Sequence, residues 1–113
     1  MTFASVGDRN AIEAEMPWEA RDVPPTLYGQ LCRTAEAFPD RPAVSYQLLS
    51  GPRDRAETLT WSELKDRTTQ AANLFRSLGI GETDTIAYVL PNANETICTL
   101  LGGAVAGIVN PIN

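Results

Sequence analysis

The sequence has 113 residues, of which 43% are hydrophobic and 20% are charged. This length allows one small domain or a part of a larger one, because single cores are typically built from about 100 to 150 residues. The composition is too apolar for a wholly disordered chain, so we expect a packed core.

The formal net charge of −5 arises mainly in the first 22 residues. That stretch holds two arginines and five acidic residues: Asp8, Glu13, Glu15, Glu19 and Asp22. Nucleic-acid binding depends on clustered Lys and Arg side chains that neutralise phosphates, and the sequence contains no such cluster. Nucleic acids and anionic membranes are therefore not expected as partners.

The two cysteines, Cys32 and Cys98, fall within predicted helices, and the sequence has no histidine that could join them in a metal site or act as a catalytic base. We interpret both as buried reduced thiols, because a free cysteine behaves as a small apolar residue. No signal peptide is recognisable at the N-terminus. The longest apolar run, residues 100–109, is shorter than the roughly 20 residues that span a bilayer. These features predict a cytoplasmic protein without a transmembrane segment.

Residues 1–25 show no sustained hydrophobic period, so we expect an extended lead-in that Trp18 could anchor to another surface. A first helix is predicted next, with Thr26 as its N-cap and Pro39 as its stop. Its apolar residues recur at helical spacing: Leu27, Leu31, Ala35 and Phe38.

Two short β-prone runs, residues 43–49 and 57–60, flank the polar segment 50–56 and predict a β-hairpin. The sequence Thr60-Trp-Ser-Glu63 then matches a capping box and predicts a helix over residues 61–78. Gly79 is expected to end this helix in a left-handed conformation. The buried face should carry five residues: Leu64, Thr68, Ala71, Phe75 and Leu78.

Residues 85–90 are apolar on both alternating faces, which is typical of a strand covered by helices on both sides. A helix is predicted from Asn92 to about Ala106, and a further strand begins at Ile108. Strand, helix and strand with short links predict a right-handed βαβ crossover with parallel pairing. The expected fold is therefore α/β, with helices packed on a mixed sheet, and we expect the chain to be the opening part of a larger α/β protein.

The junction between residues 85–90 and the following helix is a place where many α/β proteins hold a phosphate group. Such sites need glycines for close backbone approach and free N–H groups at the helix start. The turn at residues 91–95 has no glycine, and Asn92 and Glu95 have capping-box spacing. The Glu95 carboxylate would also repel an anion. We predict that this junction does not bind phosphate.

Other candidate sites have structural interpretations. Gly102 and Gly103 fall inside a predicted helix, where each costs about 1 kcal/mol relative to Ala, and close packing against a neighbour explains them better than ligand contact. The carboxylate pairs Asp54 with Glu57 and Glu63 with Asp66 are interpreted as solvated surface groups. We therefore expect no catalytic, cofactor-binding or metal-binding residue in this chain.

Five segments in order resemble the start of the adenylate-forming (AMP-binding) enzymes, which include acyl-CoA synthetases, aryl-CoA ligases and luciferases. The segments are Phe38-Pro-Asp-Arg-Pro-Ala-Val44, Leu59-Thr-Trp-Ser-Glu-Leu64, Leu78-Gly-Ile-Gly-Glu-Thr-Asp84, Val89-Leu-Pro-Asn92 and Ala106-Gly-Ile-Val-Asn-Pro-Ile-Asn113. The resemblance implies that residues 26–113 are the N-terminal part of the large AMP-binding domain, an incomplete portion of that fold.

For the parent enzyme the resemblance implies an acid–thiol ligase that uses ATP, magnesium and coenzyme A to convert a carboxylic acid, such as a fatty acid, to its acyl-CoA. The family's phosphate loop, later nucleotide-binding motifs and catalytic Lys have no counterpart in these residues, so no catalytic residue is carried over. The expected partner is the remainder of the parent enzyme, with the chain inert alone. The alternative is an independent binding or interaction module that covers its apolar faces by self-association.

Overall fold

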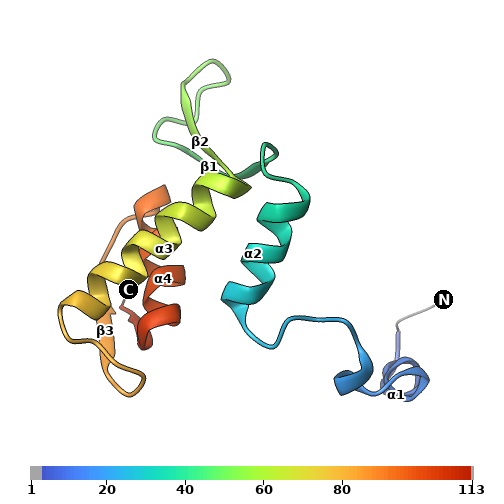
Figure 1. Ribbon diagram of the computed structural model, residues 1–113. Coiled ribbons are helices and arrows are strands. Elements are labelled where there is room, and N and C mark those ends of the chain that lie inside the picture. Colours follow the sequence, from blue (N-terminus) through green and yellow to red (C-terminus); the bar gives the residue numbers. More distant parts are fainter. Residues whose placement is uncertain (1–3, 113) are drawn as a thin grey trace.

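The computed structural model describes residues 4–112 and shows a mixed α/β chain (Figure 1). Its elements in chain order are α1 (Val6–Glu15), the 3-10 helix η1 (Trp18–Ala20), α2 (Leu27–Ala37), β1 (Pro42–Gln47), β2 (Ala56–Thr60), α3 (Trp61–Ser77), β3 (Thr85–Tyr88), α4 (Asn94–Ala106) and β4 (Ile108–Pro111). The α/β class predicted from the sequence is confirmed. Helices α2, α3 and α4 form the body with the strands, whereas α1 stands apart from it.

Helix α1 shows that the prediction of an extended lead-in over residues 1–25 is wrong for most of this segment; residues 1–3 lie outside the described part of the chain. The helix begins in a capping box, in which the Asp8 N–H donates to the Ser5 hydroxyl at 3.2 Å and the Ser5 N–H donates to the Asp8 carboxylate at 2.9 Å. Local capping stabilises a helix start without tertiary packing, which is why a search for a hydrophobic period missed it.

The predicted ends of α2 and α3 are confirmed. Thr26 caps α2, its hydroxyl accepting the Gly29 N–H at 3.0 Å. At the start of α3, Thr60 and Glu63 form both bonds of the predicted capping box. Gly79, just past the end of α3, has a φ of +88°, in the left-handed region that favours glycine.

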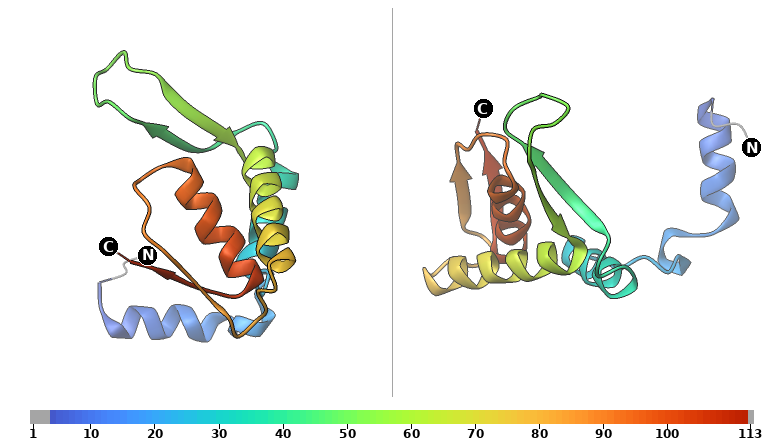
Figure 2. Two further views of the ribbon diagram at one scale, coloured as in Figure 1. Left: turned by 90° about the vertical axis from the view of Figure 1, so that its left-hand side faces the viewer. Right: turned by 90° about the horizontal axis from the view of Figure 1, so that it is seen from above.

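The predicted hairpin is also confirmed. Strands β1 and β2 pair antiparallel, with Val44 opposite Leu59 and Ser45 opposite Thr58. The hydroxyl oxygens of Ser45 and Thr58 are 2.7 Å apart, so a side-chain hydrogen bond also links the two strands. The hairpin projects beyond α2, α3 and α4 in both panels of Figure 2.

Strands β3 and β4 pair in parallel on either side of the α4 crossover, as predicted, with Thr85 opposite Ile108 and Ile86 opposite Val109. The expectation of one mixed sheet needs correction, because the described strands form two separate two-stranded sheets, β1–β2 and β3–β4. The hairpin packs Leu59 into the helical core rather than pairing edge to edge with β3.

The prediction that β3 is covered on both faces is wrong within the described residues. Along β3 the side chains alternate between exposed and half-buried, with Ile86 and Tyr88 half-buried. The other face, which we call the open face of the β3–β4 sheet, carries exposed apolar side chains, including Val89 at 72% and Ile108 at 51% exposure. Helix α4 thus covers one side of this sheet only.

The hydrophobic core lies where three helices and the hairpin meet. Its buried side chains come one each from α2, β2, α3 and α4: Leu31, Leu59, Leu64 and Cys98. Burying a leucine side chain contributes about 1.5–3 kcal/mol. A polar contact ties α2 to α3 beside this core, with the hydroxyl oxygens of Tyr28 and Thr69 2.8 Å apart.

Helices α3 and α4 lie side by side (Figures 1 and 2), and at Gly102 the backbone of α4 lies close against α3. A methyl group at Gly102 would lie 2.5 Å from the Ala71 Cβ and 3.0 Å from the backbone carbonyl oxygen of Thr68. Gly103, on the other side of α4, would place a methyl group against Val109 of the sheet. The close-packing interpretation of both glycines is therefore confirmed.

The face of α3 that meets α4 differs slightly from the predicted one. Leu64, Thr68 and Ala72 are buried, and Ala71 is only partly so. Leu78, expected on the buried face, is 70% exposed; it is the C-cap of α3, and α4 does not reach over it.

We predict that Gly102→Ala destabilises the chain. Overpacking of this kind costs about 1–3 kcal/mol, which exceeds the gain of about 1 kcal/mol from the better helix propensity of alanine. Urea unfolding followed by circular dichroism measures the change. Gly7→Ala is the matched control, because a methyl group there would meet only the Ser5 hydroxyl at an ordinary 3.5 Å. Equal stability of Gly102→Ala and the wild type would contradict the close approach.

Candidate functional site

The junction between β3 and α4 differs in detail from the sequence prediction. Helix α4 begins at Asn94 with Ala93 as its N-cap, and no side chain caps it. The predicted capping by Asn92 and Glu95 is therefore wrong, because the helix begins two residues later than predicted and Glu95 takes its second position. Near this start, the Thr96 hydroxyl instead donates to the Pro91 carbonyl oxygen.

Asn94 is the buried polar residue of this junction, with only 2% of its surface exposed. Its side-chain amide donates to the backbone carbonyl of Glu57 at 3.0 Å, which ties the start of α4 to strand β2. A buried polar group needs such a partner, so Asn94 fixes the hairpin against α4.

A cavity of about 340 Å³ lies beside this junction, between β1 and the first turn of α4. Its lining has no Lys or Arg side chain, and the first turn of α4 carries the acidic Glu95. An anion would meet the positive end of the helix dipole but no cationic side chain. The absence of phosphate binding stays a prediction, and it rests on this lining rather than on side-chain capping.

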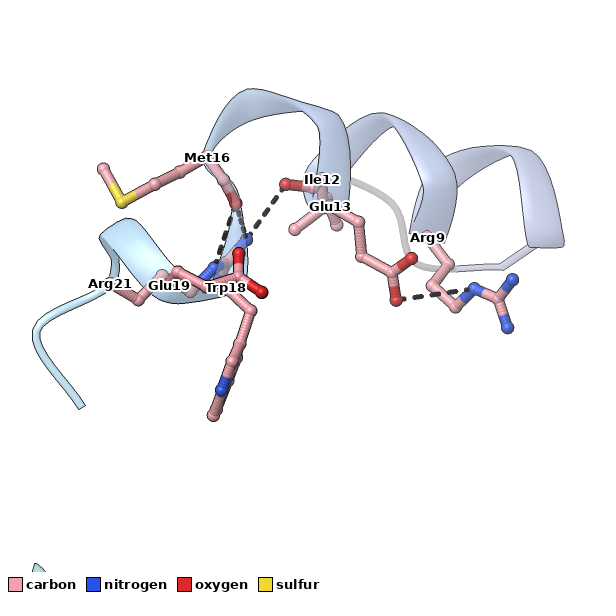
Figure 3. A pocket seen from close by; sticks show the side chains of 7 residues that line it. All are labelled: Arg9, Ile12, Glu13, Met16, Trp18, Glu19 and Arg21. Atoms are coloured by element: carbon pink, nitrogen blue, oxygen red, sulfur yellow. Dashed lines mark hydrogen bonds and ion pairs between the residues drawn. The ribbon is translucent and has the colours of Figure 1, made fainter. Parts of the chain in front are cut away.

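A larger cavity of about 610 Å³ lies between α1 and η1 (Figure 3). We call residues 4–21 the arm and this cavity the arm groove. Its lining combines apolar side chains with two acidic and two basic ones: Arg9, Ile12, Glu13, Met16, Trp18, Glu19 and Arg21. The acidic charge of this segment and the anchoring role of Trp18 were expected from the sequence, but the groove was not, because α1 was not predicted. The available signal was the three-residue spacing of Ser5 and Asp8.

Both arginines of the arm groove are engaged locally. Arg21 closes the C-terminal end of α1, with its guanidinium donating to the carbonyl oxygens of Ile12 and Met16, both at 3.2 Å. Arg9 lies 3.7 Å from the Glu13 carboxylate. Trp18 is 67% exposed, so the groove presents an open aromatic surface beside acidic side chains.

The two carboxylate pairs considered in the sequence are occupied by structural contacts. Asp54 accepts the Gly51 N–H at 2.8 Å, and Glu57 lies 3.8 Å from Arg67. Glu63 accepts the Thr60 N–H in the α3 capping box, and Asp66 lies 3.5 Å from Lys65. Neither pair is arranged as an acid and base facing a shared cavity.

The cysteines differ in burial. Cys98 is buried, as predicted. The prediction that Cys32 is buried needs correction, because this residue is only partly buried. Both cysteines are free thiols. Burial raises the pKa of the Cys98 thiol, despite the opposing charge of Arg67. A raised pKa favours the protonated thiol, in keeping with the place of Cys98 in the hydrophobic core.

Among residues 4–112 no group of three or more His, Cys, Asp or Glu side chains is placed to hold a metal ion. The same part of the chain contains no helix with the length and apolar character needed to cross a membrane.

The fold defines the class of protein. A solved structure, the fatty acyl CoA synthetase of Mycobacterium tuberculosis, matches 76% of this chain with a TM-score of 0.62 and 25% sequence identity, and the match covers 16% of that structure's chain. The sequence profile of the family described as AMP-binding enzyme matches residues 31–113. The chain belongs to the AMP-binding enzyme family.

Two curated relatives place the chain within that family. Acetyl-coenzyme A synthetase 2 of Candida glabrata is 27% identical over 97% of this chain and 16% of its own length. Marinolic acid–CoA ligase of a Pseudoalteromonas species is 32% identical over 78% of this chain and 14% of its own length. The chain therefore spans only about one seventh of the length of these relatives.

We predict that Asn94→Ala destabilises the chain by about 1–3 kcal/mol, because it leaves the Glu57 carbonyl without its partner. Urea unfolding gives the change in stability, and Asn92→Ala serves as the control, since Asn92 is exposed in the same turn. If both variants were equally stable, the amide bond would not hold the hairpin to α4.

We also predict that α1 unravels selectively in acid. The pKa of the Asp8 carboxyl lies below its ordinary value, chiefly because the Ala4 N–H donates to it, with further bonds from Ser5. A lowered pKa in the folded state means that the stabilisation is present above the ordinary aspartate pKa and is lost as pH falls through the folded value.

An NMR titration of the Asp8 carboxyl and of the α1 amides tests this prediction. The carboxyl should titrate below ordinary aspartate, and the helical shifts of α1 should fade in the same pH interval. Ser5→Ala should raise the Asp8 pKa towards its ordinary value. An unchanged titration in Ser5→Ala would contradict the capping box.

Proposed function

We propose that this chain is the N-terminal part of an ATP-dependent acyl-CoA synthetase and that it serves as scaffold, without activity of its own. The family match over residues 31–113 supports the first half of this proposal. The short share of the relatives that it spans, 16% of acetyl-coenzyme A synthetase 2 of Candida glabrata, supports the second.

The proposed reaction of the parent protein has two steps. A carboxylate attacks the α-phosphate of ATP, which forms an acyl-adenylate and releases pyrophosphate. The thiol of coenzyme A then takes the acyl group and AMP leaves. The lining of the junction cavity has no cationic side chain for ATP, and among residues 4–112 no group of acidic side chains is placed to hold a magnesium ion. We derive no step of the reaction from this chain and assign its chemistry to the rest of the parent.

The observation that carries the scaffold role is the open face of the β3–β4 sheet. The exposed side chains on this face are uncharged, and the sheet has only two strands of four residues each. Two-stranded sheets are marginal alone, and exposed apolar strand surfaces promote association. In our proposal, further elements of the parent enzyme cover this face and extend this sheet.

The second candidate is a self-associating interaction module without chemistry. The exposed arm groove and the projecting tip of the hairpin, residues 48–55, favour it, because neither contributes a side chain to the hydrophobic core. A cytoplasmic location stays a prediction for both candidates, as does a carboxylic acid substrate for the first.

We predict that the isolated 113-residue chain binds ATP no more tightly than about 1 mM, an affinity of about −4 kcal/mol. It should also give no carboxylate-dependent exchange of pyrophosphate into ATP, since in our proposal the catalytic groups lie in the rest of the parent enzyme. Isothermal titration with Mg-ATP and an exchange assay with acetate and a fatty acid measure the two properties. Micromolar ATP affinity or measurable exchange would overturn the scaffold role.

A further inference from the structure

Two parts of the chain project away from the body, and they lie on different sides of it in Figure 1 and in the left panel of Figure 2. They are the arm and the hairpin loop, which we define as residues 48–55. The Cα radius of gyration is 17.6 Å, compared with about 13 Å for a compact domain of this length. The two projections therefore leave much of their surface without an intramolecular partner.

The hairpin loop presents an apolar and basic surface. Leu48 and Leu49 are 78% and 64% exposed, and the side chains of Arg53 and Arg55 are exposed beside them. The one acidic side chain of the loop, Asp54, is turned to its own backbone and accepts the Gly51 N–H.

The loop is also held in shape from within. The Gln47 side-chain amide donates to the carbonyl oxygens of Gly51 and Asp54, at 2.7 and 3.0 Å. A loop closed by three such bonds loses little further entropy on binding, so it presents its apolar and basic side chains as a preformed surface.

The arm groove has the complementary chemistry. Its lining includes Met16, the exposed Trp18 and the carboxylates of Glu13 and Glu19. Its arginines are engaged with backbone carbonyls and with Glu13, as described above. Glu13 is itself paired with Arg9, but the arm as a whole carries four acidic and two basic residues and has a net charge of −2. The exposed Trp18 offers apolar contact to the leucine pair, and the acidic arm attracts the two arginines that follow it in the loop.

We propose that the chain self-associates, with the hairpin loop of one copy seated in the arm groove of another. Leu48 and Leu49 would pack on Trp18, and Arg53 and Arg55 would face the groove carboxylates. One chain carries both the hairpin loop and the arm groove, but the two are too far apart on it to meet. A second copy of the chain therefore provides the loop that enters the groove. A two-fold pair would make the contact twice. This proposal does not depend on the acyl-CoA synthetase assignment.

Sedimentation velocity of the 113-residue chain at low salt, over a wide range of concentrations, tests the proposal. The wild type should show a concentration-dependent shift towards a dimer, weakened by added salt because exposed charges are screened. Reversal of the loop charges (Arg53→Glu with Arg55→Glu) or of the groove charges (Glu13→Lys with Glu19→Lys) should each raise the dissociation constant at least about tenfold.

A mixture of the two charge-reversed variants should recover association, because each loop then meets a groove of opposite charge. Glu36→Lys with Glu82→Lys is the matched control: it changes the net charge by the same amount at exposed positions elsewhere, and association should persist. A monomeric wild type, failure of the mixture to associate, or equal loss in the control would each overturn the proposal.

Tryptophan fluorescence gives an independent readout. In a Trp61→Phe background, Trp18 is the only tryptophan, and its emission should shift to shorter wavelength as concentration rises. Leu48→Ser with Leu49→Ser should abolish this shift while leaving the far-ultraviolet circular dichroism unchanged. A Trp18 emission that does not respond to concentration, or a shift that survives removal of both leucines, would contradict seating of the loop in the arm groove.

Discussion

The close approach of α3 and α4 at Gly102 is the constraint on which the rest of the structure depends. A glycine there lets the backbone of α4 come within contact distance of Ala71 and the Thr68 carbonyl. Gly103 repeats this on the opposite side of α4, towards Val109 of the sheet. Helix α4 is thereby packed closely between α3 and the β3–β4 strand pair. The dispersion contacts on its two sides compensate for the poor helix propensity of the two glycines.

The position of α4 also determines where the hairpin lies. Asn94 at its first turn holds the β2 backbone, while Leu59 of β2 enters the core beside Cys98. The hairpin is therefore anchored at its base and free at its tip. No described element packs on the open face of the β3–β4 sheet. Its exposed side chains are uncharged, like those that pack against a second layer inside a larger domain. A packed side and an uncovered side on the same sheet are consistent with a scaffold that other parts of a larger enzyme complete.

Much of this architecture could be predicted from the sequence, because it depends on local rules. The capping box of Thr60 and Glu63, the left-handed Gly79 and the parallel crossover all follow from residue type and spacing. The predictions that were wrong concern helix ends and contacts between distant segments, which hydrophobic periodicity does not reveal. Helix α1 depends on end capping and has no apolar face to reveal it. The junction cap was misassigned because α4 begins at Asn94, two residues later than the spacing of Asn92 and Glu95 predicts. The arm groove was missed because it needs both α1 and η1 to exist.

The mass of the native protein tests the central claim most directly. An antibody against this chain would isolate the protein from its source, and intact mass spectrometry would then weigh it, with sequencing of the gene beyond the codon for Asn113. Our account predicts a protein several times the 12.3 kDa of this chain, with a reading frame that continues into a Ser-, Thr- and Gly-rich loop ending in Lys. A native mass near that of this chain, with a stop codon after Asn113, would contradict the scaffold assignment and leave an interaction module in its place.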